Sequence, residues 1–219
     1  MDWTQRYARS HPDAPVVQAT PETRVLDLDD DSDSDSDDDD ANKEAAVSCP
    51  RRWREWLESH PGRWVLKDSE ANRGQAVHFV DSAVPRTTTH ALKLLAEGRA
   101  KCWVAQRYVA SPLLASGRKF HLRVHALAIG DVAVWTHAAP ACLPASAAYA
   151  CSEIDDMFAH ATNHCVNKHH PGRVDGGALA GTLTLAELAP LVYEQTPFAS
   201  PEEFHKHVVE QLQVRTRPD

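Results

Sequence analysis

The stretch KCWVAQRYVASPLLASGRKFHLRVHALAI (residues 101–129) decides the predicted fold. Two apolar runs flank a short loop that contains Ser111, Pro112 and Gly117, which predicts a strand, a loop and a second strand. Side chains of a strand alternate between its two faces. In the second strand one face therefore carries Lys119, His121, Arg123 and His125, and the other carries Phe120, Leu122, Val124 and Ala126.

This row of cationic or titratable side chains favours a binding site for a polyanion. Alternate side chains on one face of a strand are about 7 Å apart, and like charges at that spacing repel each other unless an anion lies between them. A purely structural sheet gains no stability from such a row. The second strand is therefore the candidate anion-binding element.

Three motifs, in order along the chain, resemble the tubulin–tyrosine ligase family, whose members have an ATP-grasp fold. They are WVLK with NRGQ (64–67 and 72–75), QRYV with PLL and RKFHLRV (106–109, 112–114 and 118–124), and HATNHCVNK (160–168). The motifs cover about half of the chain. The resemblance implies an α+β fold of mostly antiparallel sheet packed with helices, with central and C-terminal ATP-grasp subdomains, the latter truncated.

The sequence predicts two regions of different character. Residues 1–46 are expected to be disordered, since the run DLDDDSDSDSDDDD (27–40) repels itself and lacks aromatic residues. Residues 50–219 are expected to form a partial ATP-grasp domain of the tubulin–tyrosine ligase type. Leaving out the ten Asp of the acidic run changes the net charge from −8 to +2. This mild excess fits an acidic ligand and does not favour nucleic acid, which requires a strongly basic patch.

The sequence shows none of the usual targeting signals, which favours a cytoplasmic protein. The sequence has no apolar run of about 18 residues, so no membrane span is expected, and its first residues lack the apolar segment of a signal peptide. The five Cys are scattered without CxxC pairs, as in reduced cytosolic proteins. The family resemblance adds an expected association with the cytoskeleton.

Hydrophobic periodicity predicts the remaining elements. Helices are expected at 51–59, 87–99, 183–193 and 201–214, and strands at 63–67, 75–80, 101–109 and 132–137. Thr88 or Thr89 is expected to cap the helix at 87–99, and Ser200 the helix at 201–214. A tight hairpin turn is expected at Gly130 and Asp131.

The resemblance implies an ATP site that begins in the first motif. Lys67 would reach the nucleotide phosphates, and a loop with the residues Arg73, Gly74 and Gln75 would fold over them. Backbone N–H groups beside a glycine can approach phosphate oxygens closely because no Cβ intervenes. Gly74 is the only glycine of this loop, where relatives are often glycine-rich, so a looser grip is expected.

The second motif would supply the adenine hinge and the catalytic cations. The hinge residues are Gln106, Arg107, Tyr108 and Val109, which would read the adenine edge through backbone N–H and C=O groups. Lys119 and Arg123 match family positions that meet the phosphates and the transferred group, and the planar fork of Arg123 suits a carboxylate. His121 replaces an acid usual in the family, and a neutral imidazole can still hydrogen-bond a ribose or phosphate oxygen.

The third motif has three readings. By resemblance, Thr162 and Asn163 lie near the nucleotide and Lys168 holds the incoming amino acid. As bare chemistry, a zinc site is conceivable from the residues Cys151, His160, His164, Cys165, His169 and His170. Their spacing fits no zinc motif, and an ordinary packed loop is the third alternative. We therefore predict no metal site here.

The implied cofactors are ATP and Mg²⁺, but the family's Mg²⁺ ligands, a strand Asp followed by a Glu and an Asn, have no counterpart in the sequence. Asp155 and Asp156 lie before the third motif and do not match by position. Residues 138–148, AAPACLPASAA, also contain no Arg where relatives carry one that meets the amino acid.

Three functions follow from these observations. The first is an ATP-dependent ligase of the tubulin–tyrosine-ligase-like family, in an incomplete copy, which forms a carbon–nitrogen bond between an amino acid and the acidic tail of tubulin or another protein. The second is a catalytically inactive module that binds nucleotide or tubulin as a partner protein. The third is an unrelated basic α+β binding domain. Enzymatic activity is left open because the Mg²⁺ ligands are missing.

Overall fold

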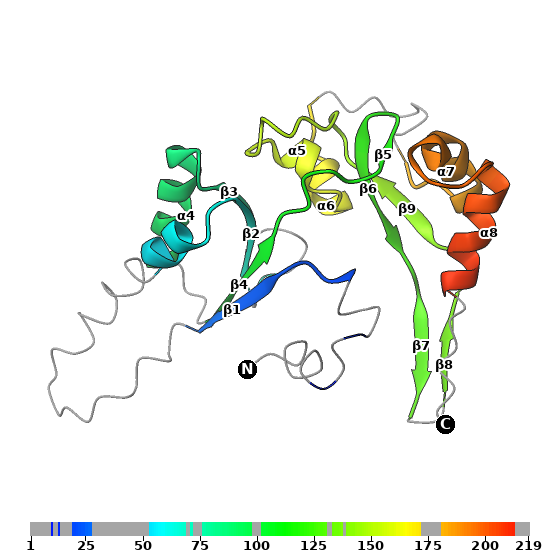
Figure 1. Ribbon diagram of the computed structural model, residues 1–219, viewed down its shortest axis with the longest axis horizontal. Coiled ribbons are helices and arrows are strands. Elements are labelled where there is room, and N and C mark those ends of the chain that lie inside the picture. Colours follow the sequence, from blue (N-terminus) through cyan, green and yellow to red (C-terminus); the bar gives the residue numbers. More distant parts are fainter. Residues whose placement is uncertain are drawn as a thin grey trace, which may run out of the picture. The chain divides into compact units, whose positions relative to one another are not determined.

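The computed structural model describes residues 10, 13, 19–27, 53–68, 71, 76–97, 102–130, 133–137, 139–171 and 181–212. The chain divides into two compact units, Met1–Ala110 and Ser111–Asp219, and each is described by itself (Figure 1). Both units combine helices with antiparallel strands, which confirms the predicted mixed α and β composition. The more specific assignment to an ATP-grasp architecture stays a prediction.

Four antiparallel strands form the sheet of the first unit, in the order β1-β4-β2-β3. Their bounds are Thr23–Asp27 for β1, Arg63–Asp68 for β2, Val77–Asp81 for β3 and Cys102–Arg107 for β4. In the register, Gln106 of β4 lies opposite Val65 of β2 and opposite Thr23 of β1. Gln106 therefore has a neighbouring strand on each side.

Two helices pack against this sheet through one apolar core. The first helix covers residues 53–59 and the second is α4, Pro85–Glu97. The buried core comprises Trp53, Leu57, Trp64, Leu66, Val80, Ala91, Leu92, Leu95, Trp103 and Ala105. Trp64 is fully buried at its centre and its Nε1 donates to the carbonyl oxygen of His60, 2.9 Å away. The predicted helix at 51–59 is confirmed over its described residues 53–59, and the predicted strands of this unit are confirmed with different ends, since β3 begins at Val77 and β4 ends at Arg107.

Strand β1 is a correction to the expected disorder of residues 1–46. Thr23 to Asp27 pair with β4 over five residues, from Thr23 opposite Gln106 to Asp27 opposite Cys102. Pairing satisfies the backbone groups of a short segment that has little apolar surface of its own. Because the partner strand follows about 80 residues later in the sequence, local composition did not reveal it. Residues 28–46 lie outside the described residues.

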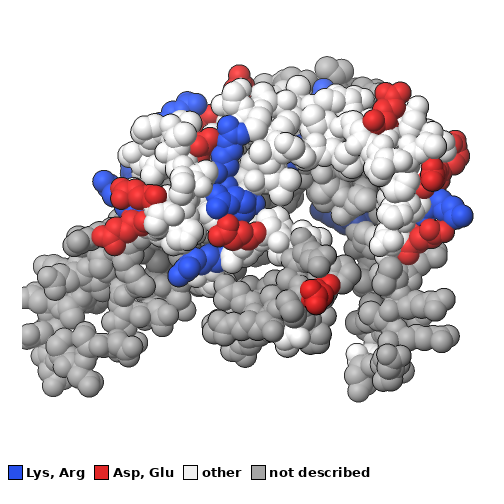
Figure 2. Space-filling model, viewed as in Figure 1, with Lys and Arg blue, Asp and Glu red and all other residues white. Residues whose placement is uncertain are grey.

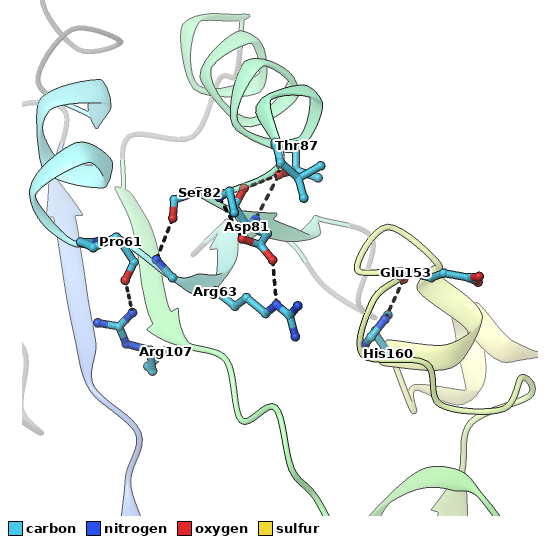
Figure 3. Close-up of polar contacts among 11 residues, drawn as sticks. Pro61, Arg63, Asp81, Ser82, Thr87, Arg107, Glu153 and His160 are labelled. Atoms are coloured by element: carbon cyan, nitrogen blue, oxygen red, sulfur yellow. Dashed lines mark hydrogen bonds and ion pairs between the residues drawn. The ribbon is translucent and has the colours of Figure 1, made fainter.

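Helix α4 begins earlier than predicted, at Pro85. Thr88 and Thr89 lie inside the helix, so the prediction that one of them caps it is wrong. A proline suits the first helical turn because its φ is already near the helical value and its missing N–H is not needed there. Thr87 instead ties the helix to the sheet, since its Oγ1 accepts from the backbone N–H of Asp81 at 3.0 Å (Figure 3).

The turn before β2 requires a glycine. Gly62 has φ +118°, a left-handed backbone conformation that residues with a side chain rarely adopt. A Cβ at this position would lie 2.8 Å from Nη1 of Arg107. The Arg107 guanidinium occupies this space because Nη1 donates to the carbonyl oxygen of Pro61 at 2.9 Å (Figure 3). Its Cζ lies 3.9 Å from the centroid of the Trp64 ring. The end of β4 is thus held against the start of β2.

The second unit contains a three-stranded sheet and a separate hairpin. The sheet has the order β5-β6-β9, with the bounds Leu114–Ala115, Arg118–Arg123 and Ala141–Pro144. The hairpin consists of β7, Ala126–Ile129, and β8, Ala133–Thr136. The single strand expected to run on to residue 129 is therefore wrong: β6 ends at Arg123, where it pairs with Ala141, and a different sheet begins at Ala126.

The hairpin turn is one residue longer than predicted. Ile129 pairs with Ala133, so three residues connect β7 and β8 rather than two. Gly130 has φ +56°, a left-handed conformation that glycine adopts without steric cost. The hairpin itself is confirmed.

Helices pack on the sheet of the second unit. They are α5 Met157–His160, α6 His164–Asn167, α7 Leu185–Val192, the 3-10 helix η1 Tyr193–Gln195 and α8 Pro201–Leu212. Residues of α7 and α8 form one buried cluster with Ala115 and Cys142 of the sheet. The helix predicted at 183–193 is confirmed as α7, which begins two residues later, and the helix predicted at 201–214 is confirmed over its described residues 201–212. Ser200 Oγ accepts from the Glu203 N–H at 3.2 Å as the expected cap.

Surface charge alone does not locate a site in the described residues. On the face in Figure 2, Lys and Arg side chains lie among Asp and Glu side chains. Lys206 and Glu210 of α8 lie 3.8 Å apart as an exposed ion pair. Within the part of the chain that the structure describes, no helix is long and apolar enough to cross a bilayer. Candidate residues must therefore be located by their individual contacts.

Candidate functional site

Strand β6 carries the predicted row of cations in the second unit. Phe120 and Leu122 pack against the buried cluster of α7 and α8. Alternation places Lys119, His121 and Arg123 on the other face of the strand. His125 lies beyond the end of β6, so the row has three members and not the four predicted. Lys119 and His121 are half-buried and Arg123 is exposed.

Lys119 lies in a partly dehydrated environment. Burial lowers the pKa of its ammonium to about 8, and a smaller effect of Cys151 acts in the opposite direction. Its Nζ lies 6.0 Å from the centroid of the Tyr149 ring. The Tyr149 ring in turn contacts the buried His160 edge-on, with the centroids 5.3 Å apart, and His160 Nε2 lies 2.8 Å from the carbonyl oxygen of Glu153 (Figure 3).

A hydrogen bond joins His121 to the third motif. Its Nδ1 lies 2.7 Å from Oγ1 of Thr162, a residue 41 positions further along the chain. Burial, followed by the charge of Arg123, lowers the pKa of the His121 imidazole, which favours its neutral form. The structure thus brings together two residues that were assigned separately to the nucleotide.

The third motif is held in place by an asparagine that the sequence analysis overlooked. Asn167 is buried, and its Nδ2 donates to the carbonyl oxygens of Ala161 and Asn163 at 2.6 and 3.0 Å. Its Oδ1 accepts from the Ser146 N–H at 2.6 Å. Nothing in a four-residue helix distinguishes such an asparagine from a surface residue. Asn167 fixes the backbone on both sides of Thr162.

The remaining residues of the third motif have separate surroundings. Asn163 caps α6 by accepting from the Cys165 N–H at 2.8 Å, so its side-chain oxygen already has a structural partner. Lys168 follows α6 as its C-cap and is exposed. Asp156, excluded above as a metal ligand by position, caps α5. Among the described residues, no group of three or more His, Cys, Asp or Glu side chains could hold a metal ion.

Lys67 and the hinge residues lie in the first unit. Lys67 is half-buried, burial lowers the pKa of its ammonium, and its Nζ donates to Oε1 of Gln106 at 2.8 Å. The N–H groups of Arg107 and Tyr108 donate to the carbonyl oxygens of Glu22 and Arg63 at 2.7 and 2.9 Å, so both have partners within the unit. Val109 is 50% exposed, which leaves it as the accessible hinge residue.

Two consequences follow for the predicted hinge and loop. The Arg107 side chain is a structural contact, with its Nη2 3.0 Å from Oε2 of Glu22, and this agrees with the expectation that its identity matters little for adenine. Adenine contact through the N–H groups of Arg107 and Tyr108 would require their present bonds to break. The loop residues Arg73, Gly74 and Gln75 lie outside the described residues.

Residues 5–177 match the tubulin-tyrosine ligase family. Since the match covers most of the chain, the chain belongs to this family, and the family resemblance of the three motifs is confirmed.

Curated relatives match a shorter segment. The chain is similar to the probable tubulin polyglutamylase TTLL9 of Bos taurus, with 35% identity over 71 residues. The proteins of the same name from Mus musculus and Rattus norvegicus are 37% identical over 71 residues. Each match covers 32% of this chain and 15% of the relative, so the chain matches only a small part of these relatives' length.

Proposed function

We propose that this chain is the nucleotide-binding part of an ATP-dependent ligase that joins an amino acid to the tail of a protein. The observation that carries the proposal is the 2.7 Å contact between His121 and Thr162. It places the β6 row beside the third motif, two segments whose assignment to one nucleotide came only from family resemblance. Membership of the tubulin-tyrosine ligase family supports the same reaction class.

The chemistry needs cations more than it needs covalent help from the protein. A tail carboxylate attacks the γ-phosphorus of ATP, ADP leaves, and the amine of the incoming amino acid then displaces phosphate from the acyl phosphate to form the amide. Two anions must be held together in the first step. Lys119 would neutralise phosphate charge, and Arg123 would bind a carboxylate or phosphate through two parallel hydrogen bonds. The exposed Lys168 would hold the amino acid.

Magnesium, held by protein carboxylates, would offset phosphate charge in this reaction. The described residues hold no cluster that fits it, so we assign it no residue and no step. We propose that the acceptor is tubulin or another protein with an acidic tail. The protein would act in the cytoplasm, in association with the cytoskeleton.

A second candidate is a catalytically inactive module that binds nucleotide or tubulin. It is favoured by the run AAPACLPASAA at 138–148, which offers no guanidinium for the amino-acid substrate. Strand β9 lies within this run and pairs with β6 beside the predicted site. A module of this kind would keep the phosphate contacts and lose the transfer step.

Calorimetric titration of the whole chain with ATP, with and without Mg²⁺, separates these functions. For the ligase we expect ATP binding that Mg²⁺ strengthens by about tenfold or more, which corresponds to about 1.4 kcal/mol or more, because a divalent cation offsets phosphate charge. Weak ATP binding whose affinity does not depend on Mg²⁺ would favour the inactive module. A folded chain that binds no ATP in either buffer would contradict the nucleotide site. ADP release with an acidic peptide and labelled amino acids then tests the transfer step.

A further inference from the structure

Three side chains in the first unit form a directed chain of hydrogen bonds across three strands. Lys67 Nζ on β2 donates to Oε1 of Gln106 on β4 at 2.8 Å. Gln106 Nε2 donates to Oγ1 of Thr23 on β1 at 2.9 Å. The Thr23 hydroxyl donates in turn to the carbonyl oxygen of Pro21 at 2.7 Å. All three side chains are half-buried.

The direction of the chain follows from the chemistry of its ends. An ammonium can only donate, so Gln106 must present its oxygen to Lys67 and its NH₂ to Thr23. Thr23 can accept this NH₂ because its own proton is directed to Pro21. The hydroxyl on β1 thereby anchors the NH₂ end of the Gln106 amide, whose oxygen is turned toward the ammonium. The amide orientation then fixes where the Lys67 ammonium lies.

A neutral partner preserves the use of Lys67 as a cation. A carboxylate at the position of Gln106 would cancel the charge, whereas an amide oxygen orients the ammonium and leaves its positive charge available. Burial lowers the pKa of Lys67, so a firm acceptor also compensates for lost hydration. A lysine stem has four rotatable bonds, and holding it in place before binding reduces the entropy lost when an anion binds.

We propose that Thr23, acting through Gln106, positions Lys67 for the phosphates of the bound nucleotide. Thr23 is a positioning residue, and β1 becomes part of the support of the nucleotide site rather than a segment before it. This inference rests on the proposed ATP site. It gives a role to a strand that lies before the acidic run.

Thr23→Val tests the inference in the whole chain, because valine keeps the branched shape and strand preference but cannot accept a hydrogen bond. Affinities for ATP, ADP and adenosine are measured by calorimetry. We expect ATP to bind about three- to tenfold more weakly, the effect of about one hydrogen bond, with adenosine unchanged. Thr23→Ser should restore ATP affinity. Arg24→Gln, at the exposed next position of β1, is the matched control and should bind like the parent.

A double-mutant cycle excludes a merely structural effect of Thr23. In a Lys67→Met background, Thr23→Val should no longer change ATP affinity, because the group that it positions is absent. The inference is overturned by unchanged ATP affinity in Thr23→Val, by an equal loss for adenosine, or by the same loss in the Lys67→Met background.

A second readout does not depend on nucleotide. Acetylation of Lys67 by an amine-reactive ester, followed by mass spectrometry of its peptide, should be several-fold faster in Thr23→Val than in the parent or in Arg24→Gln, and equal rates would overturn the inference. If Lys67→Met leaves ATP affinity unchanged, the proposed phosphate role of Lys67 fails. The acetylation rates then still decide whether Thr23 holds Lys67.

Discussion

Replacing Trp64 by Ala is expected to lower the free energy of unfolding of the first unit by about 3–5 kcal/mol. Trp64 is fully buried among the residues that join the helix at 53–59 and α4 to the sheet. Its ring contacts Trp56 edge-on, with the centroids 4.6 Å apart, and supports the Arg107 guanidinium. Truncation would remove a large apolar surface and leave a cavity that the surrounding helices and strands cannot fill.

Urea unfolding followed by circular dichroism measures this loss. Trp64→Phe is the matched variant, since it keeps an aromatic ring and loses only part of the volume and the hydrogen bond to His60. We expect it to lose about 1–2 kcal/mol. An unfolding midpoint of Trp64→Ala close to that of the parent would show that this core does not stabilise the unit.

Lys119→Ala is expected to weaken ATP binding by about 10- to 100-fold, the effect of losing one charged hydrogen-bond donor. Lys119 is half-buried on β6, where lower solvent screening strengthens its attraction to a phosphate. The variant should remain folded, because removing a partly buried charge from a strand whose opposite face forms the core costs little packing.

The matched control is Lys206→Ala on α8, in the same unit. The Lys206 side chain is 77% exposed and lies 3.8 Å from the carboxylate of Glu210, a pair that contributes little in water. It should bind ATP like the parent, and thermal unfolding should show both variants folded. Equal ATP affinity for Lys119→Ala and Lys206→Ala would remove β6 from the nucleotide site.

Much of the fold could be predicted where local pattern decides the structure. Helix α8 follows from Ser200 as its cap and from apolar residues at helical spacing, of which Phe204 is buried. The alternation on β6 follows from Phe120 and Leu122, which pack as expected. By contrast, β1 depends on pairing with β4, and the end of β6 depends on where β9 stops pairing with it. Such long-range pairings cannot be inferred from the pattern of a short stretch of sequence.

The sequence named candidate residues for the site but not the contacts that they make. His121 and Thr162 were both assigned from the motifs, yet only the folded chain shows that they touch. Thr23 and Asn167 could not be recognised, because a hydroxyl in a short strand and an amide in a short helix resemble ordinary surface residues until their partners are known. The family resemblance suggested a role for each candidate residue, and the structure identified the groups that contact these residues.

The dependence of ATP affinity on pH tests the central claim most directly, since it reports whether the Lys119 ammonium itself binds phosphate. Burial lowers the pKa of Lys119 to about 8, so the side chain is charged below that pH and loses its charge as the pH rises through it. If the charged form binds, affinity should be constant below about pH 7.5 and about tenfold weaker by about pH 9.

Lys119→Arg completes this measurement, because a guanidinium stays charged throughout the range and should abolish the fall between about pH 7.5 and pH 9. The account predicts a fall in the parent that is absent from Lys119→Arg. A parent whose affinity does not change with pH, or a fall of the same size in both proteins, would contradict it.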